Sequence, residues 1–90
     1  MNKAQLVEHL ASEVHLAKAD CERILETTVE TIKKNVRKGE DVTLVGFGTF
    51  TRSKRKARTA RNPQTGEPIK VPARTVPKFR CGKDFKEYLN

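Results

Sequence analysis

The sequence predicts an α+β fold, with helices in residues 1–39 and antiparallel strands in most of the remainder. Apolar residues recur at helical spacing up to residue 39, and beyond it they alternate with polar residues as in strands. In addition, residues 53–76 carry most of the net positive charge and little apolar surface. We therefore expect one domain over residues 1–90, with a helical hairpin, an antiparallel β-sheet, a long protruding two-stranded β-arm and a short C-terminal helix.

The first helix is predicted to begin after Asn2, whose side chain can form a capping box with Gln5. After a break at residues 15–17, a second helix is expected from Lys18 to Lys38. Gly39 then stands where a C-terminal glycine cap belongs. The apolar residues of the first helix follow at helical spacing and are Leu6, Val7, Leu10 and Val14.

The sheet body is predicted from residues 40–52 and 77–81. Val42 and Leu44 alternate with polar neighbours, which is typical of a strand. The following sequence, VGFGTF at residues 45–50, has two glycines two positions apart and predicts a tight turn between strands. Aromatic residues beside such a turn are expected to pack in the core.

Residues 53–76 are predicted to form the β-arm, because they have too few apolar residues for a core of their own. The arm should run out to Asn62 and return from Glu67, with the turn sequence NPQTG between its strands. We expect Pro72 and Pro77 to flank the return strand, since proline is tolerated only on edge strands. An isolated two-stranded ribbon is marginally stable in water, so the arm should be mobile without a partner. Residues 82–90 are assigned to the C-terminal helix.

The charge is concentrated in the arm. The chain has 19 basic and 11 acidic residues and a net charge of +8; residues 1–40 are neutral overall, whereas residues 53–76 carry +6. A focused basic segment attracts a polyanion, although a solvated basic loop without a partner is the alternative. The basic residues of the arm are Lys54, Arg55, Lys56, Arg58, Arg61, Lys70 and Arg74.

Several classes of protein are disfavoured by the composition. No apolar run approaches the roughly 18 residues of a membrane span, and no secretory leader is recognisable, so we expect a cytoplasmic protein without membrane contact. Cys21 and Cys81 are too few for a disulfide framework and lack zinc-ligand spacing, and we expect both thiols to be buried. No paired nucleophile and base is present, so we expect neither an enzyme nor a metal or cofactor site.

The small size of the chain predicts a dimer. Without the arm about 66 residues remain, and domains of this size bury only roughly 60% of their unfolded surface. Oligomerisation is the usual remedy where disulfides and metals are absent. We therefore expect a shared dimer core that includes Phe47, Phe50 and Phe79.

The arm combines regularly spaced arginines with a proline at its tip. Arg55, Arg58 and Arg61 recur every three residues, and a strict strand would divide them between its two faces. Either a local bulge or a grip on two sides of a groove would accommodate this spacing. Arginine suits phosphate contact and narrow minor grooves. Pro63 is compact and apolar, so it can act as a wedge between base pairs as well as a turn former.

Four motifs together resemble the bacterial HU/IHF family of histone-like, DNA-bending proteins, and its HU branch in particular. They are VGFGTF at 45–50, RNPQTG at 61–66, VPKF at 76–79 and GK at 82–83, and the resemblance covers the whole chain. It implies an intertwined dimer, with residues 1–39 as the helical dimerisation part and two β-arms in the DNA minor groove. By the family pattern Pro63 intercalates; the general description of minor-groove wedging already includes this family.

The resemblance also implies roles for individual residues. The arm cations Arg55, Arg58 and Arg61 would contact DNA, and three cations of the dimer body would contact flanking phosphates. Lys54, Lys56 and Arg74 add arm charge beyond the family pattern. The full set of expected DNA-binding residues is Lys3, Lys54, Arg55, Lys56, Arg58, Arg61, Asn62, Pro63, Gln64, Lys70, Arg74, Lys83 and Lys86.

The expected function is binding and bending of double-stranded DNA in the bacterial nucleoid, with little sequence specificity. Flexible or distorted DNA (bent, nicked or at a junction) should be favoured because it costs less to deform. We expect a homodimer, and a heterodimer with a paralogue is a further possibility. Two alternatives remain: an RNA-binding or ribosome-associated basic protein, and a sequence-specific subunit like integration host factor.

Overall fold

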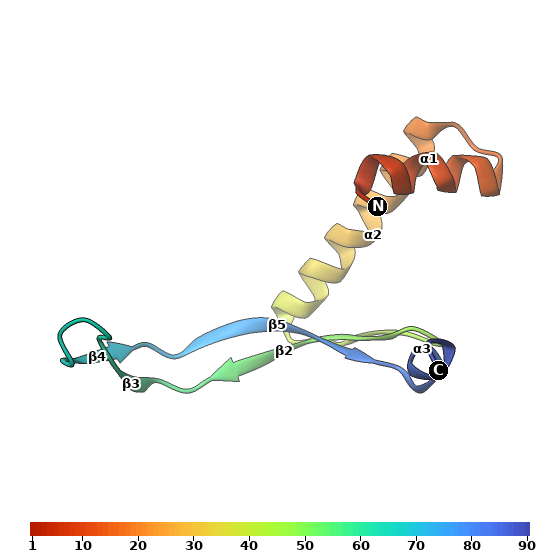
Figure 1. Ribbon diagram of the computed structural model, residues 1–90. Helices are drawn as coiled ribbons and strands as arrows, with labels where there is room; N and C mark the ends of the chain where they lie inside the picture. The colour runs from red at the N-terminus through yellow and green to blue at the C-terminus, as the bar shows by residue number, and fades with distance from the viewer. The chain divides into compact units, whose positions relative to one another are not determined.

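The computed structural model describes residues 1–90 and has the predicted α+β fold (Figure 1). The chain divides into two compact units, Met1–Lys34 and Asn35–Asn90, which are described in turn. The elements in chain order are α1 (Lys3–Val14), α2 (Lys18–Lys38), β1 (Val42–Leu44), β2 (Gly48–Arg55), β3 (Arg58–Arg61), β4 (Pro68–Val71), β5 (Arg74–Cys81) and α3 (Lys83–Tyr88).

The capping box predicted for α1 is confirmed. The backbone N–H of Gln5 donates to Asn2 Oδ1 at 2.9 Å, and the backbone N–H of Asn2 donates to Gln5 Oε1 at 3.0 Å. The helix ends at His15, which adopts a left-handed conformation with φ 57° although it is not a glycine. The predicted break between the helices is therefore present.

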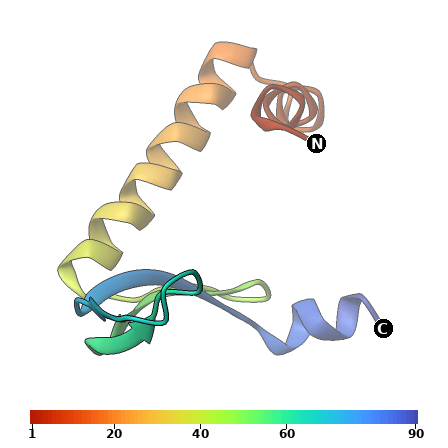
Figure 2. The ribbon, with the colours of Figure 1, turned by 60° about the vertical axis from the view of Figure 1, so that its left-hand side comes forward.

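The long helix α2 is uninterrupted and ends at the predicted glycine cap (Figure 2). Gly39 has φ 92°, which L side chains rarely adopt. Its N–H donates to the Val36 carbonyl at 3.0 Å, and the N–H of Glu40 donates to the Asn35 carbonyl at 2.9 Å. This pair of bonds is a Schellman motif, which satisfies carbonyls that the helix leaves free at its end.

The sheet body is antiparallel with strand order β1–β2–β5. Phe50 on β2 lies opposite Val42 on one neighbouring strand and opposite Phe79 on the other. The β1–β2 turn is closed by the Phe47 N–H, which donates to the Leu44 carbonyl at 3.0 Å. At Gly48 a Cβ atom would lie 2.6 Å from the Arg80 carbonyl oxygen, so the close approach of the strands requires glycine there.

The β-arm continues the β2–β5 ladder but has a gap in its pairing. Strands β3 and β4 form a separate two-stranded sheet, and residues 56–57 and 72–73 between the two ladders are unpaired. The last pair before the gap is Arg55 with Arg74, and the first pair after it is Arg58 with Val71. The gap has two residues on each strand, so the register is kept and the local bulge considered from the sequence does not occur.

Two expectations about single residues are wrong. Pro77 does not flank the return strand but lies within β5, opposite Arg52. It is tolerated there because β5 is an edge strand, on which alternate N–H groups have no ladder partner. Cys81 is exposed because it ends this edge strand, whereas Cys21 is buried in the helical unit as expected.

The single chain has almost no core. Val7 and Cys21 are its only buried hydrophobic residues. A compact monomer of 10.2 kDa would expose about 5,300 Å², whereas this chain exposes 7892 Å². The exposed apolar surface is therefore larger than a stable monomer normally tolerates. No helix has both the length and the apolar character needed to cross a membrane.

The largest apolar group is an aromatic cluster in the sheet body. Phe47 has its ring centroid 5.1 Å from that of Phe79 and 5.2 Å from that of Phe85 on α3. The rings of Phe50 and Phe79 are 4.9 Å apart. Phe47 and Phe79 nevertheless remain 42% and 38% exposed, so the cluster has an open side.

Candidate nucleic-acid interface

The tip of the arm is a turn held by its own side chains. Asn62 Oδ1 accepts from the Gln64 N–H at 2.9 Å, and the Asn62 carbonyl accepts from the Gly66 N–H at 2.7 Å. The Asn62 N–H in turn donates to the Glu67 carbonyl at 2.8 Å. These bonds use the polar groups around Pro63 and leave its apolar ring exposed at the end of the arm. A rigid ring in that position has the geometry of a wedge.

The cations of the arm are exposed and form no ion pairs. None of the seven lies within salt-bridge distance of a carboxylate, and Glu67, the only acidic residue of the arm, also has no ion-pair partner. Their charge is therefore available to an external anion. Lys54 and Arg55 lie on β2, Lys56 in the gap, Arg58 and Arg61 on β3, Lys70 on β4 and Arg74 on β5.

The preserved register assigns the arm cations to two faces. Direct partners in a ladder share a face and successive residues alternate. Thr59 pairs with Lys70, so Lys70 and Arg61 lie on one face of the β3–β4 ladder. Arg58 lies on the other face together with its partner Val71. The arginine spacing thus supports the second interpretation from the sequence, in which the arm presents positive charge to two sides of a groove.

Two of the cations expected on the dimer body lie on α3, which both ribbon views place at the opposite end of the β2–β5 ladder from the arm tip (Figures 1 and 2). Lys83 contacts Glu87 at 3.8 Å, a weak pair with both side chains exposed, and Lys86 has no ion-pair partner. The helix is fixed to the sheet by the Gly82 N–H, which donates to the Phe47 carbonyl at 2.9 Å. Positive charge is therefore present at both ends of this unit.

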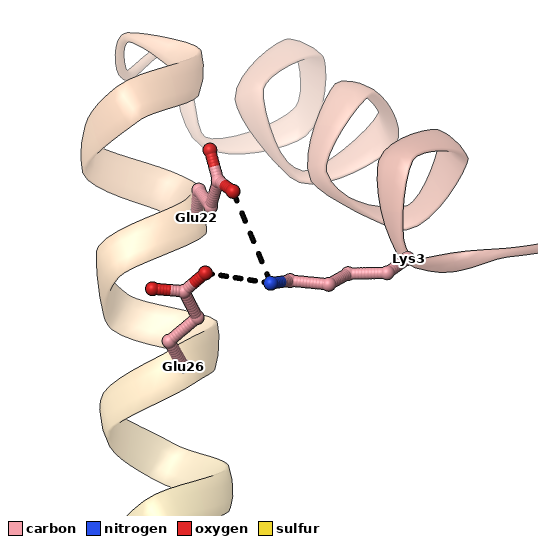
Figure 3. Close-up of polar contacts among 3 residues, drawn as sticks. All are labelled: Lys3, Glu22 and Glu26. Atoms are coloured by element: carbon pink, nitrogen blue, oxygen red, sulfur yellow. Dashed lines mark hydrogen bonds and ion pairs between the residues drawn. The ribbon is translucent and has the colours of Figure 1, made fainter.

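The third such cation, Lys3, belongs to the helical unit and is already paired (Figure 3). Its Nζ lies 2.6 Å from Glu26 Oε1 and 3.9 Å from Glu22 Oε1. The hydrogen bond with Glu26 raises the pKa of Lys3 and lowers the pKa of Glu26. Lys3 therefore differs from the arm cations, because an external phosphate would have to compete with two carboxylates.

One further cation, not expected from the sequence, has the same properties as those of the arm. Lys78 on β5 is exposed and has no ion-pair partner. It shares a face with Arg74 and Arg80, because the three occupy alternate positions of one strand. That alternation is visible in the sequence, but Lys78 lies beyond the segment in which the charge is concentrated.

The site is built for non-covalent contact with an anion. It consists of exposed guanidinium and ammonium groups, tip amides and one exposed proline ring. No group of three or more His, Cys, Asp or Glu side chains is placed to hold a metal ion. The arrangement can neutralise charge along an extended polyanion and insert an apolar ring beside it.

Comparison with known proteins agrees with this geometry. Residues 1–90 match the family described as "Bacterial DNA-binding protein". The chain is 47% identical to the DNA-binding protein HU-beta of Serratia marcescens over all 90 residues of both proteins. It is 48% identical to the DNA-binding protein HU of Clostridium pasteurianum, covering 100% of this chain and 99% of the relative.

Solved structures give the same result. An Anabaena HU–DNA cocrystal structure matches with a TM-score of 0.92 and 44% identity, covering 99% of this chain and 97% of the other. HU from Thermotoga maritima matches with a TM-score of 0.71 and 33% identity over the whole of both chains. On the strength of its full-length sequence match and its fold, this chain belongs to the family of bacterial DNA-binding proteins.

Proposed function

We propose that this protein binds and bends double-stranded DNA with little sequence specificity, as an architectural component of the bacterial nucleoid in the cytoplasm. The observation that carries the proposal is the β-arm, with seven exposed cations free of ion pairs and an exposed proline at its tip. The relatives named DNA-binding protein HU and the HU–DNA cocrystal structure support it. The family is a DNA-binding family and not an enzyme family, and the proposed action is non-catalytic.

The arm is proposed to work in the minor groove. Arg55, Arg58 and Arg61 neutralise phosphates and release counterions, which gives affinity without reading sequence. Asn62 and Gln64 lie beside the tip and position it, while Pro63 enters a base step and unstacks it. Smooth bending of a site costs on the order of 1–6 kcal/mol. Contacts of the bent DNA with Lys83 and Lys86 on α3 offset that cost.

We propose that the working unit is a dimer, so that two arms act on one duplex. The open side of the aromatic cluster supports this, since Phe47 and Phe79 are 42% and 38% exposed in the single chain. The chain exposes roughly 2,600 Å² more than a compact monomer of its mass, and permanent interfaces bury areas of this order. A second chain would complete the core that Phe47, Phe50 and Phe79 begin.

Low specificity follows from the groove that the arm is proposed to enter. The minor groove presents a degenerate pattern of donors and acceptors, and few polar side chains at the tip could read base edges. Nicked, bent or junction DNA should bind more tightly than intact duplex, because less deformation is required.

A direct test uses a random-sequence duplex of about 30 base pairs, a length over which bending has a defined cost, labelled at both ends. Binding and end-to-end distance are measured for intact and nicked duplex over a series of salt concentrations. We expect affinity to fall steeply with salt and the ends to approach, more so for nicked DNA. Salt-sensitive binding with unchanged end-to-end distance would contradict the bending function.

The same assay distinguishes the alternative partners. Duplex RNA of equal length is added as a competitor, and a panel of unrelated DNA sequences is compared at fixed salt. Competition by RNA as strong as that by DNA would favour an RNA-binding protein. One sequence bound far more tightly than the rest would favour a sequence-specific subunit.

A further inference from the structure

The gap in the arm ladder coincides with a hollow lined by cations. Four basic side chains line it, together with Ala57, Val71 and Pro72, and no carboxylate does. The basic residues are Arg55, Lys56, Arg58 and Arg74. The hollow lies between the sheet body and the tip, away from Pro63, so the wedge proposed above does not account for it.

Two of these cations lie directly opposite each other. Arg55 and Arg74 are the last partners of the β2–β5 ladder, and like charges in that position weaken strand pairing. Neither guanidinium has an ion-pair or hydrogen-bond partner in the chain. An anion placed between them would turn this repulsion into two attractions.

The backbone of the gap adds unused donors. The N–H groups of Lys56, Ala57 and Ala73 make no backbone hydrogen bond, because the ladder stops at Arg55–Arg74 and resumes at Arg58–Val71. Pro72 has no N–H, so it could not close the ladder from its side. Cationic side chains and free N–H groups around one hollow are the chemistry that recognises a phosphate.

We propose that the hollow binds one phosphate group of the DNA backbone, which joins the two strands of the arm through Arg55 and Arg74. Lys56 and Arg58 supply further positive charge at the rim. The inference rests on the proposed DNA binding and adds a second contact to it, separate from the wedge at the tip. Because guanidinium groups bind phosphate in a bidentate manner, the bound phosphate would also fix the arm at its unpaired point.

The test removes one arginine from the full-length dimer. R74Q is compared with wild-type protein and with K34Q, which removes one charge from an exposed position on α2. We expect R74Q to flatten the slope of log affinity against log salt by about 0.9 for each phosphate that the variant no longer neutralises. K34Q should keep the wild-type slope, and the end-to-end distance of saturated duplex should stay the same in R74Q.

A charge reversal gives a second readout. R74E would set a carboxylate opposite Arg55, so the arm of the free protein should exchange its amide hydrogens more slowly while DNA binding weakens further. An unchanged salt slope in R74Q, or faster exchange in R74E, would overturn the inference. If wild-type protein neither binds nor bends the duplex, the proposed function itself fails; if it bends DNA and the R74Q slope is unchanged, only the phosphate site fails.

Inorganic phosphate serves as the probe for the source of the ligand. Amide NMR shifts of residues 55–58 and 72–74 are followed in free protein during a phosphate titration. Shifts that occur in wild type and disappear in R74Q, together with the flatter salt slope on DNA, support a site for backbone phosphate. Phosphate-induced shifts without any change in the DNA salt slope would mean a site for free phosphate and would contradict the DNA contact.

Discussion

The sheet body and the β-arm share one antiparallel register but carry opposite kinds of side chain. In the body, Phe50 faces Phe79 and their ring centroids are 4.9 Å apart. Beyond the gap, Thr59 faces Lys70, and Arg58 faces Val71 with its charge unpaired. The same backbone geometry thus supports an apolar cluster at one end and a cationic surface at the other. Strand pairing sets the reach of the hairpin, while side-chain chemistry decides which part holds the molecule together and which part binds.

The two regions also differ in what orders them. The β2–β5 ladder has eight residue pairs and is joined by β1 and the aromatic cluster. The β3–β4 ladder has four pairs and no third strand. Two-stranded ribbons are marginally stable alone. We therefore expect the body to be ordered by its own packing and the arm to become ordered on DNA.

The largest expected effect comes from removing an aromatic ring of the body. F79A should destabilise the dimer by about 3–5 kcal/mol, the usual cost for a buried ring, because the open side of the cluster is covered by the partner chain. The matched change in the arm is I69A, at a residue 45% exposed, which should cost under about 0.5 kcal/mol.

Urea unfolding at two protein concentrations a hundredfold apart measures both variants. Wild-type stability should rise with concentration, as in any folded dimer. Equal losses for F79A and I69A would remove the distinction between body and arm. A midpoint independent of concentration would contradict the dimer.

A smaller effect is expected from removing an arm cation. R61A should weaken binding to all sequences by a similar factor and flatten the salt slope by about 0.9 per phosphate contact. The control is T59A, which changes a neutral residue on the same face of the arm. Loss of affinity confined to particular sequences would indicate base reading instead of phosphate contact.

The smallest effect concerns Lys3, the one expected DNA contact that is already paired. E26Q removes its nearest carboxylate, at 2.6 Å, and should strengthen DNA binding by no more than a few-fold, since exposed ion pairs are weak. Binding of longer duplexes over a salt series measures this, with E13Q on α1 as the control because Glu13 has no ion-pair partner. Weaker DNA binding in E26Q would mean that Lys3 is not held back by its carboxylates.

The pH dependence of this ion pair follows from both pKa shifts. The pKa of Glu26 is lowered, so the pair is complete above the ordinary glutamate pKa and is lost as pH falls through the lowered value. The pKa of Lys3 is raised, so the pair is complete below the ordinary lysine pKa and is lost only as pH rises through the raised value. The difference between E26Q and wild type should therefore persist across neutral pH and disappear in acid.

Much of the fold could be predicted because its signals are local. The capping box at Asn2, the glycine cap at Gly39 and the turn at residues 62–66 each depend on neighbours in sequence. The gap in the arm and the place of Pro77 within β5 could not be predicted, because they depend on which strands pair and which edge stays free.

The candidate site divides in the same way. Charge spacing identified the arm, whereas the pairing of Lys3 with Glu26 joins two helices 23 positions apart in sequence and required the structure. The facing of Arg55 and Arg74 likewise depends on register alone. No feature of the sequence near either residue indicates its partner.

The most direct test of the division between body and arm is the shape of DNA bound by a tip variant. End-to-end distance is measured for one labelled nicked duplex saturated with wild-type protein and with P63A. We predict that P63A keeps the stability of the dimer and most of the affinity but leaves the DNA ends farther apart. Equal end-to-end distances for the two proteins, at equal saturation, would contradict the wedge at the arm tip.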